Sequence, residues 1–242
     1  MSILLALDSS TETMALALTS PEGRWLFEAE GGAQASARLV PEALALLAAA
    51  GLSLAAVDAI AFGRGPGAFT GLRAACAVVQ GLAFGAVKPV LAIDSLMLVA
   101  EDARQQAETA GQALTGSVWV AMDARMGEIY AACYAWRLGV WSTEVEPALY
   151  TPARLCDAWL VQPPVAVAGS ALAVFADQLA LAEQPSCRLW PRSQSRAAAL
   201  ATLAAQAWAA GAQVDAAEAM PVYVRDKVAQ TTAERLAARV SP

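Results

Sequence analysis

The chain has 242 residues, of which 57 % are hydrophobic and 16 % charged, so it can bury a large core and is not an intrinsically disordered protein. Its net charge of −6 argues against a strongly basic nucleic-acid-binding protein. It contains no histidine, which excludes a Ser-His-Asp triad, a Cys-His dyad and every zinc site that needs a histidine ligand.

The first half of the chain is predicted to alternate buried strands with helices. Short apolar runs bounded by turn residues predict strands, and Leu/Ala-rich segments predict helices. The expected strands are 3–7, 13–19, 24–30, 58–62 and 90–93, and the expected helices are 37–50, 70–85 and 95–108. The chain therefore opens with three consecutive strands and then alternates helix with strand.

The second half repeats this order. We expect strands at 117–122, 127–136, 140–149 and 165–168 and helices at 152–161 and 170–181. Each half ends its first strand with an aspartate, Asp8 or Asp123, although a strand that ends in an aspartate and a turn also occurs by chance. A duplicated βββαβα unit resembles the α/β fold of the actin-like superfamily, which includes the ASKHA and ribonuclease H-like proteins. We therefore predict two lobes, at residues 1–110 and 111–242.

The turns after these two aspartates are candidates for a vestigial nucleotide-binding site. Asp8 offers a carboxylate for a metal ion, and the hydroxyl groups of Ser9 and Ser10 could bind phosphate, but the same residues also cap ordinary turns. The turn after Asp123 carries bulky side chains, including that of Arg125, where a phosphate loop needs small residues. We therefore expect no cofactor, no metal and no hydrolysis of ATP, although Arg125 could contact an anion.

A glycine-rich loop follows the strand at 58–62 and supports an alternative function. Gly63, Gly65 and Ala68 match the G-x-G-x-x-A pattern of dinucleotide-binding oxidoreductases, and the next strand ends at Asp94, where such an enzyme holds ribose. Pro66 lacks the backbone N–H that a pyrophosphate needs, and three opening strands are not typical of that fold. The oxidoreductase remains the alternative to the partner role described below.

The helix at 70–85 presents two different faces. One face, with Leu72, Val79 and other apolar residues, is expected to cover a sheet. A solvated opposite face would be rich in Lys and Glu, but here it carries one charge, a glycine and a phenylalanine. Either this helix is buried on both sides within the chain, or the second face binds a partner subunit. The expected interface consists of Leu39 and Leu46 on the helix at 37–50 and of Arg73, Ala77, Gln80, Gly81 and Phe84 on the helix at 70–85.

The cysteines and the N-terminal residues predict the compartment in which the protein acts. The four cysteines are scattered, and the N-terminus lacks the features of a signal peptide, which predicts buried, reduced thiols and a cytoplasmic protein with no membrane span.

Basic residues recur near the C-terminus and could touch RNA phosphates weakly, although a solvated helix face is the more ordinary interpretation. They are Arg188, Arg192, Arg196, Arg225, Lys227, Arg235 and Arg239.

Several motifs together are similar to the TsaB (YeaZ) family, over essentially the whole chain. The most specific is the string GRGPGAFTGLR at residues 63–73. The other matching segments are 3–11, 36–41, 58–62, 80–83, 122–130 and 221–226. Members of this family often have a histidine where this chain has Ala35, so no role for that imidazole can be carried over.

The resemblance implies a non-catalytic subunit in the synthesis of tRNA threonylcarbamoyladenosine. Its catalytic paralogue, TsaD, binds metal and transfers the threonylcarbamoyl group to adenosine 37 of tRNAs that read ANN codons, and the ATPase TsaE joins the complex. The resemblance also implies a homodimer through the N-terminal lobe when the chain is alone, and only indirect or weak contact with tRNA. An older family name suggests a protease, but the residues supply no histidine and no recognisable Ser-Lys dyad for it.

Overall fold

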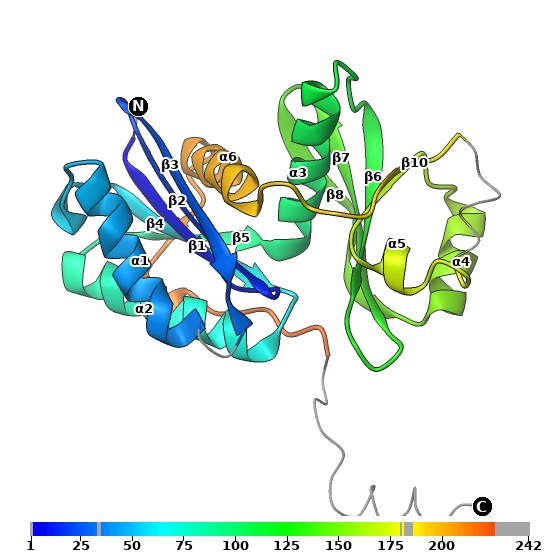
Figure 1. Cartoon of the computed structure of the whole chain (residues 1–242), viewed down its shortest axis with the longest axis horizontal. Helices are drawn as coiled ribbons and strands as arrows, with labels where there is room; N and C mark the ends of the chain where they lie inside the picture. The colour runs from blue at the N-terminus through cyan, green and yellow to red at the C-terminus, as the bar shows by residue number, and fades with distance from the viewer. Residues whose placement is uncertain (1, 33–34, 180, 182–185, 226–242) are drawn as a thin grey trace, which may run out of the picture.

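The computed structural model describes residues 2–32, 35–179, 181 and 186–225. It contains two β-sheets, and helices lie on both faces of each (Figure 1). Two helices, labelled α3 and α6, lie between the sheets, and the remaining helices cover the outer faces (Figure 1). The predicted basic residues at 227, 235 and 239 lie outside the described residues.

The first sheet has the strand order β11-β5-β4-β1-β2-β3. Its central strand β1 (Leu4–Asp8) is buried along its whole length, and it pairs antiparallel with β2 (Thr13–Ser20) and parallel with β4 (Ala59–Gly65). The edge strand β3 (Gly23–Glu30) alternates half-buried with exposed residues, as expected for a strand with one solvated face. The other strands are β5 (Val90–Asp94) and β11 (Gln213–Val214).

Helices α1 (Ala35–Ala49) and α2 (Phe69–Ala86) cover the outer face of this sheet. Their inward side chains join those of the strands in one core, to which Leu39, Leu47, Ala75 and Val79 belong. α2 is long and apolar enough to cross a membrane by length and composition alone, but one of its faces is buried against the sheet. A short 3₁₀ helix, Leu54–Ala56, connects α1 to β4.

The second sheet repeats the first. Its order is β10-β9-β6-β7-β8, which places its five strands as β5-β4-β1-β2-β3 are placed in the first sheet. The strands are β6 (Gly116–Asp123), β7 (Ile129–Arg137), β8 (Val140–Tyr150), β9 (Ala166–Ala168) and β10 (Arg188–Trp190). Asp8 and Asp123 end equivalent strands, and the predicted duplication is confirmed.

Two predictions about the second half were wrong. The predicted helix at 170–181 is a single helical turn, α5 (Ala171–Val174), whereas α4 (Pro152–Val161) has the predicted bounds. Residues 196–214 do not belong to the second sheet: α6 (Arg196–Ala209) packs on β1, β2 and β5, and β11 pairs with β5. The chain returns to the first sheet because the apolar residues of α6 are buried against its inner face.

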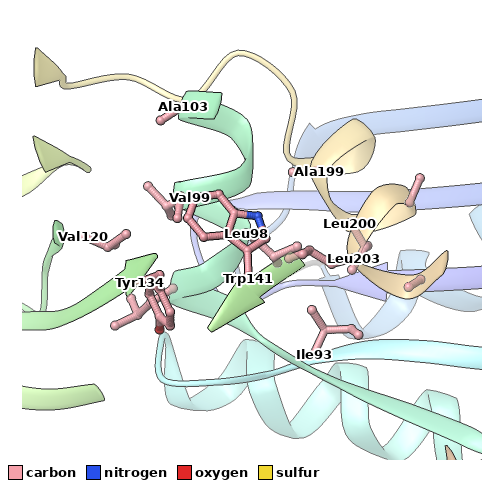
Figure 2. Packing of buried hydrophobic residues seen from close by; sticks show 14 of the residues in the cluster. Ile93, Leu98, Val99, Ala103, Val120, Tyr134, Trp141, Ala199, Leu200 and Leu203 are labelled. Atoms are coloured by element: carbon pink, nitrogen blue, oxygen red, sulfur yellow. The ribbon is translucent and has the colours of Figure 1, made fainter. Parts of the chain in front are cut away.

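The two sheets share one hydrophobic core, centred on α3 (Ser95–Thr109) (Figure 2). Leu98 and Val99 of α3 pack in one cluster with Tyr134 and Trp141 from the second sheet and with Leu200 of α6 (Figure 2). A core that extends across both lobes joins them more firmly than a surface contact does.

Polar groups within this shared core are paired. The Tyr134 hydroxyl donates a hydrogen bond to Asp94 (2.7 Å), whose carboxylate also caps α3 by accepting from the Leu96 amide (2.8 Å). The Trp141 indole donates to the buried carboxylate of Glu101 (2.8 Å), which also binds Arg104. Burial raises the pKa of Asp94 and of Tyr134 above their usual values.

The four cysteines are free thiols, as predicted, but only two of them are fully buried. Cys76 and Cys133 are buried, whereas Cys156 and Cys187 are partly exposed. Burial raises the pKa of the Cys133 thiol to about 12, so at neutral pH this group is protonated and unreactive.

Candidate functional site

The first candidate site is the solvent-facing side of α1 and α2. Phe84 is 81 % exposed and Leu44 is 48 % exposed. Gly81 is also exposed, and a Cβ atom at this position would have no heavy atom within 4 Å. This surface, which we call the outer face, consists of Leu44, Ala45, Ala48, Ala77, Gly81, Phe84 and Gly85. The alternative in which α2 is buried on both sides within this chain is therefore wrong.

The predicted interface residues do not all lie on the outer face. Leu39 and Leu46 are 0 % and 9 % exposed, because both side chains point into the core beneath α1, so neither can contact a partner. Ala77, Gly81 and Phe84 are exposed as predicted. Sequence reasoning missed Leu44, which follows Leu39 by five positions and therefore lies on the opposite side of the helix.

Arg73 and Gln80 lie at the edge of the outer face and contact the chain itself. The Gln80 amide donates a hydrogen bond to the carbonyl oxygen of Ala219 (2.9 Å). The Arg73 guanidinium lies over the Phe69 ring, 3.8 Å from its centroid, and donates to the Tyr223 hydroxyl (3.1 Å). The C-terminal segment therefore runs along one side of the predicted interface.

The second candidate site is the turn after β1. Its carboxylate, Asp8, is buried and forms an ion pair with Arg196 at the start of α6 (2.8 Å). Ser10 donates to Asp8 (3.0 Å) and accepts a hydrogen bond from Arg196 (3.0 Å). The positive charge beside Asp8 is therefore supplied by the chain. Arg196 was expected to lie on a solvated helix face, where it could touch RNA weakly, but its side chain is buried and does neither.

The glycine-rich loop packs against this same turn. A side chain on Gly63 would clash with Asp8, one on Gly67 with Ser10, and one on Gly71 with the Ser9 backbone. Ser9 also donates to the Gly71 carbonyl (2.8 Å). The glycines therefore allow two segments of the same chain to approach each other closely.

The donors of the loop are also used within the chain. The Ala68 amide donates to the Ser10 carbonyl (2.7 Å) and the Gly65 amide to the Ser95 hydroxyl (3.0 Å). Asp94, which a dinucleotide-binding enzyme would use for ribose, caps α3 and binds Tyr134. The arrangement does not support the oxidoreductase alternative.

The turn after β6 holds Arg125 and Met126 in the left-handed region, with φ of 63° and 58°. The Arg125 amide donates to Asp123 (2.8 Å), and its guanidinium pairs with Asp123 (3.4 Å) and with Glu12 of the first lobe. Both Arg125 and Met126 are exposed toward the space between the lobes. A turn with these side chains does not form the close backbone cradle that a phosphate needs.

A cleft of about 820 Å³ lies between the two turns. The structure places all five predicted nucleotide-site residues at or beside this cleft, with Ser10, Asp123 and Arg125 in its lining. Much of the remaining wall is apolar and includes Phe69, Leu96 and Met122. Within the described residues, no three His, Cys, Asp or Glu side chains lie together as metal ligands.

Two βββαβα units with the same strand order, facing each other across a cleft, define an actin-like α/β protein. Residues 32–237 match the family model described as TsaD, tRNA N6-adenosine threonylcarbamoyltransferase. The chain is 31 % identical to the tRNA threonylcarbamoyladenosine biosynthesis protein TsaB of Escherichia coli, over 93 % of this chain and 96 % of that protein.

A second relative and a solved structure agree. The chain is 43 % identical to TsaB of Haemophilus influenzae over 129 residues, which span about half of each protein (52 % and 51 %). The structure of YeaZ from Pseudomonas aeruginosa superposes with a TM-score of 0.79 at 38 % identity, covering 92 % of this chain and 100 % of that one. The chain therefore belongs to the matched family and, within it, to the TsaB (YeaZ) proteins.

Proposed function

We propose that this chain is a non-catalytic subunit in the biosynthesis of tRNA threonylcarbamoyladenosine. It docks through the outer face onto a TsaD-like catalytic paralogue, a TsaE-like ATPase joins them, and the chain pairs with itself when alone. The relatives named TsaB support the pathway. The bare outer face is the observation that carries the partner role.

Two properties of the outer face fit a helix-packing interface. It is apolar across two adjacent helices, with Leu44 on α1 and Phe84 on α2 both solvent-exposed. Ala77, Gly81 and Gly85 leave the middle of α2 without side-chain bulk, so another helix can approach closely. Exposed apolar patches of this kind mark sites of protein association.

The turn after β1 supports the non-catalytic part of the proposal. In this chain Arg196 and Ser10 already bind the Asp8 carboxylate, and the turn after β6 carries Arg125 and Met126. A metal ion or phosphate that bound at the Asp8 carboxylate would have to displace this buried ion pair, which is costly because it leaves a buried charge unpaired. We place the reaction in the partner subunit and the complex in the cytoplasm, and contact with tRNA is indirect or weak.

Reconstituted modification of tRNA tests the proposal. The assay contains tRNA that reads ANN codons, threonylcarbamoyl adenylate and the TsaD-like and TsaE-like proteins of the same bacterium, with and without this chain. We expect modified adenosine only when the chain is present, and none when the chain acts alone. Equal modification without the chain, or modification by the chain alone, would contradict the proposal.

A further inference from the structure

The segment Ala219–Arg225, which we call the strap, crosses from α2 to the second lobe. It follows the 3₁₀ helix Ala216–Glu218, which packs on α2. Its residues from Val222 onward line the cleft between the lobes. Nothing in the nucleotide-site or interface predictions accounts for this segment.

The strap is bonded to the first lobe along α2. The carbonyl oxygen of Ala219 accepts hydrogen bonds from Cys76 (3.2 Å) and Gln80 (2.9 Å). The Val222 amide donates to the carbonyl oxygen of Arg64 (2.7 Å). The Tyr223 ring packs on Phe69 with 4.6 Å between centroids. Arg73 completes this attachment through the Tyr223 hydroxyl.

The far end of the strap is bonded to the second lobe through Arg225. Its guanidinium donates to the carbonyl oxygen of Ala124 (3.1 Å) and to the Glu128 carboxylate (2.6 Å). The Arg225 side chain is 12 % exposed and that of Glu128 is 33 % exposed, so this ion pair is partly shielded from water. The strap therefore ties α2 to the turn after β6.

We propose that the strap links partner docking on α2 to the second lobe, an inference that rests on the proposed function. Arg73 and Gln80 border the outer face and hold the strap. A partner that covers them excludes water, and their hydrogen bonds to the strap strengthen in the lower local dielectric. Docking then stabilises the bound strap, and through Arg225 it orders the turn 124–128.

Thermodynamic linkage makes this coupling reciprocal. If docking stabilises the bound strap, then releasing the strap from the second lobe weakens docking by the same factor. Arg225 lies at the far end of the strap, and its hydrogen bonds are to the turn after β6. If the strap only stabilises the fold, the prediction is the opposite: losing the Arg225 hydrogen bonds lowers the free energy of unfolding and leaves the affinity for the partner unchanged.

The experiment compares Arg225→Ala with Arg137→Ala, which removes an ion pair of the second lobe (with Glu144) that has no contact with the strap. Affinity for the TsaD-like protein is measured by calorimetry. Hydrogen exchange of residues 124–128 is measured with and without that protein. We expect Arg225→Ala to weaken binding about fivefold or more and to abolish partner-induced protection of the turn. Arg137→Ala should change neither.

The outcomes separate the two proposals. If the wild-type chain does not bind the TsaD-like protein, the proposed function fails. If the wild type binds and Arg225→Ala binds equally well, or the turn gains no protection in the wild type, the linkage is overturned. Arg225→Lys serves as the test if Arg225→Ala does not fold: it keeps the charge that pairs with Glu128 but not the planar fork of donors that also reaches the carbonyl oxygen of Ala124. It is expected to bind with intermediate affinity, and wild-type affinity would overturn the linkage.

Discussion

At the scale of single residues, glycines in the same helix have opposite roles. Gly71 lets α2 approach the turn after β1, and a side chain there would clash with the Ser9 backbone. Gly81 faces open space on the outer face. Replacing each glycine with a larger residue should therefore change the free energy of unfolding in opposite directions.

Replacing each glycine with alanine tests this difference. Gly71→Ala should lower the free energy of unfolding by about 1–3 kcal/mol, because the added methyl group has no space. Gly81→Ala should raise it by about 0.5–1 kcal/mol, because alanine is the better helix former and meets nothing. Denaturant unfolding measures both. Equal effects of the two substitutions would show that the close approach at Gly71 is not as described.

The buried pair of Asp8 and Arg196 gives a second prediction at this scale. Arg196→Met leaves a buried carboxylate unpaired and should cost about 3–5 kcal/mol of stability. Adding Asp8→Asn removes that charge and should restore part of the loss. Arg38→Met, which breaks a partly exposed pair with Glu42, is the control and should cost about 0.5 kcal/mol or less. A loss at Arg196 no larger than at Arg38 would mean that the pair is not buried.

At the scale of elements, α1 has one buried face and one exposed face, and two leucines five positions apart lie on opposite faces. Leu39 is fully buried and Leu44 is half exposed. Leu39→Ala should lower stability by about 2–5 kcal/mol through the cavity it leaves. Leu44→Ala should leave unfolding unchanged and weaken association with the TsaD-like protein. Thermal unfolding and calorimetry measure the two effects, and the reverse pattern would contradict the assigned outer face.

Periodicity predicted the elements and part of the site. The helix at 70–85 is found at Phe69–Ala86, and its exposed face carries Ala77, Gly81 and Phe84 as the helical wheel required. Leu39 and Leu46 were misassigned because leucines on an amphipathic helix belong to its core face first. The helix predicted at 170–181 is only the turn Ala171–Val174, so the pattern of apolar residues did not predict its length.

Contacts between distant segments could not be predicted. Arg196 and Asp8 are 188 positions apart, and Arg225 binds a turn about 100 positions earlier. No periodic pattern encodes such a pairing. The glycines of the loop at 63–71 were visible in the sequence, but whether they approach a ligand or another part of the chain depends on that tertiary contact.

At the scale of the whole molecule, the duplication could be predicted from the sequence, but the assignment of the C-terminal elements to a lobe could not. The repeated order of strands and the aspartates at 8 and 123 indicated two lobes. The return of α6 and β11 to the first sheet interleaves the lobes in sequence. Together with α3, α6 fills the space between the sheets (Figure 1).

A shared core predicts cooperative unfolding. Calorimetry of the full chain should show one transition, because each lobe loses the inner core that it shares with the other when that other lobe unfolds. Trp141→Ala removes a side chain that packs between the lobes and should lower that single transition temperature, since deleting a core tryptophan costs about 3–5 kcal/mol. Two resolved transitions, or a shift in only one of them, would show that the lobes are independent.

The central claim is that the outer face of α1 and α2 binds the catalytic paralogue, and titration of the TsaD-like protein with Gly81→Leu tests it most directly. The control is Ala205→Leu, at an exposed position of α6 on the other side of the sheet. We predict that both variants unfold at or above the wild-type temperature. Gly81→Leu should lose affinity about tenfold or more through steric exclusion, and Ala205→Leu should bind as the wild type does. Wild-type affinity for Gly81→Leu would contradict the account.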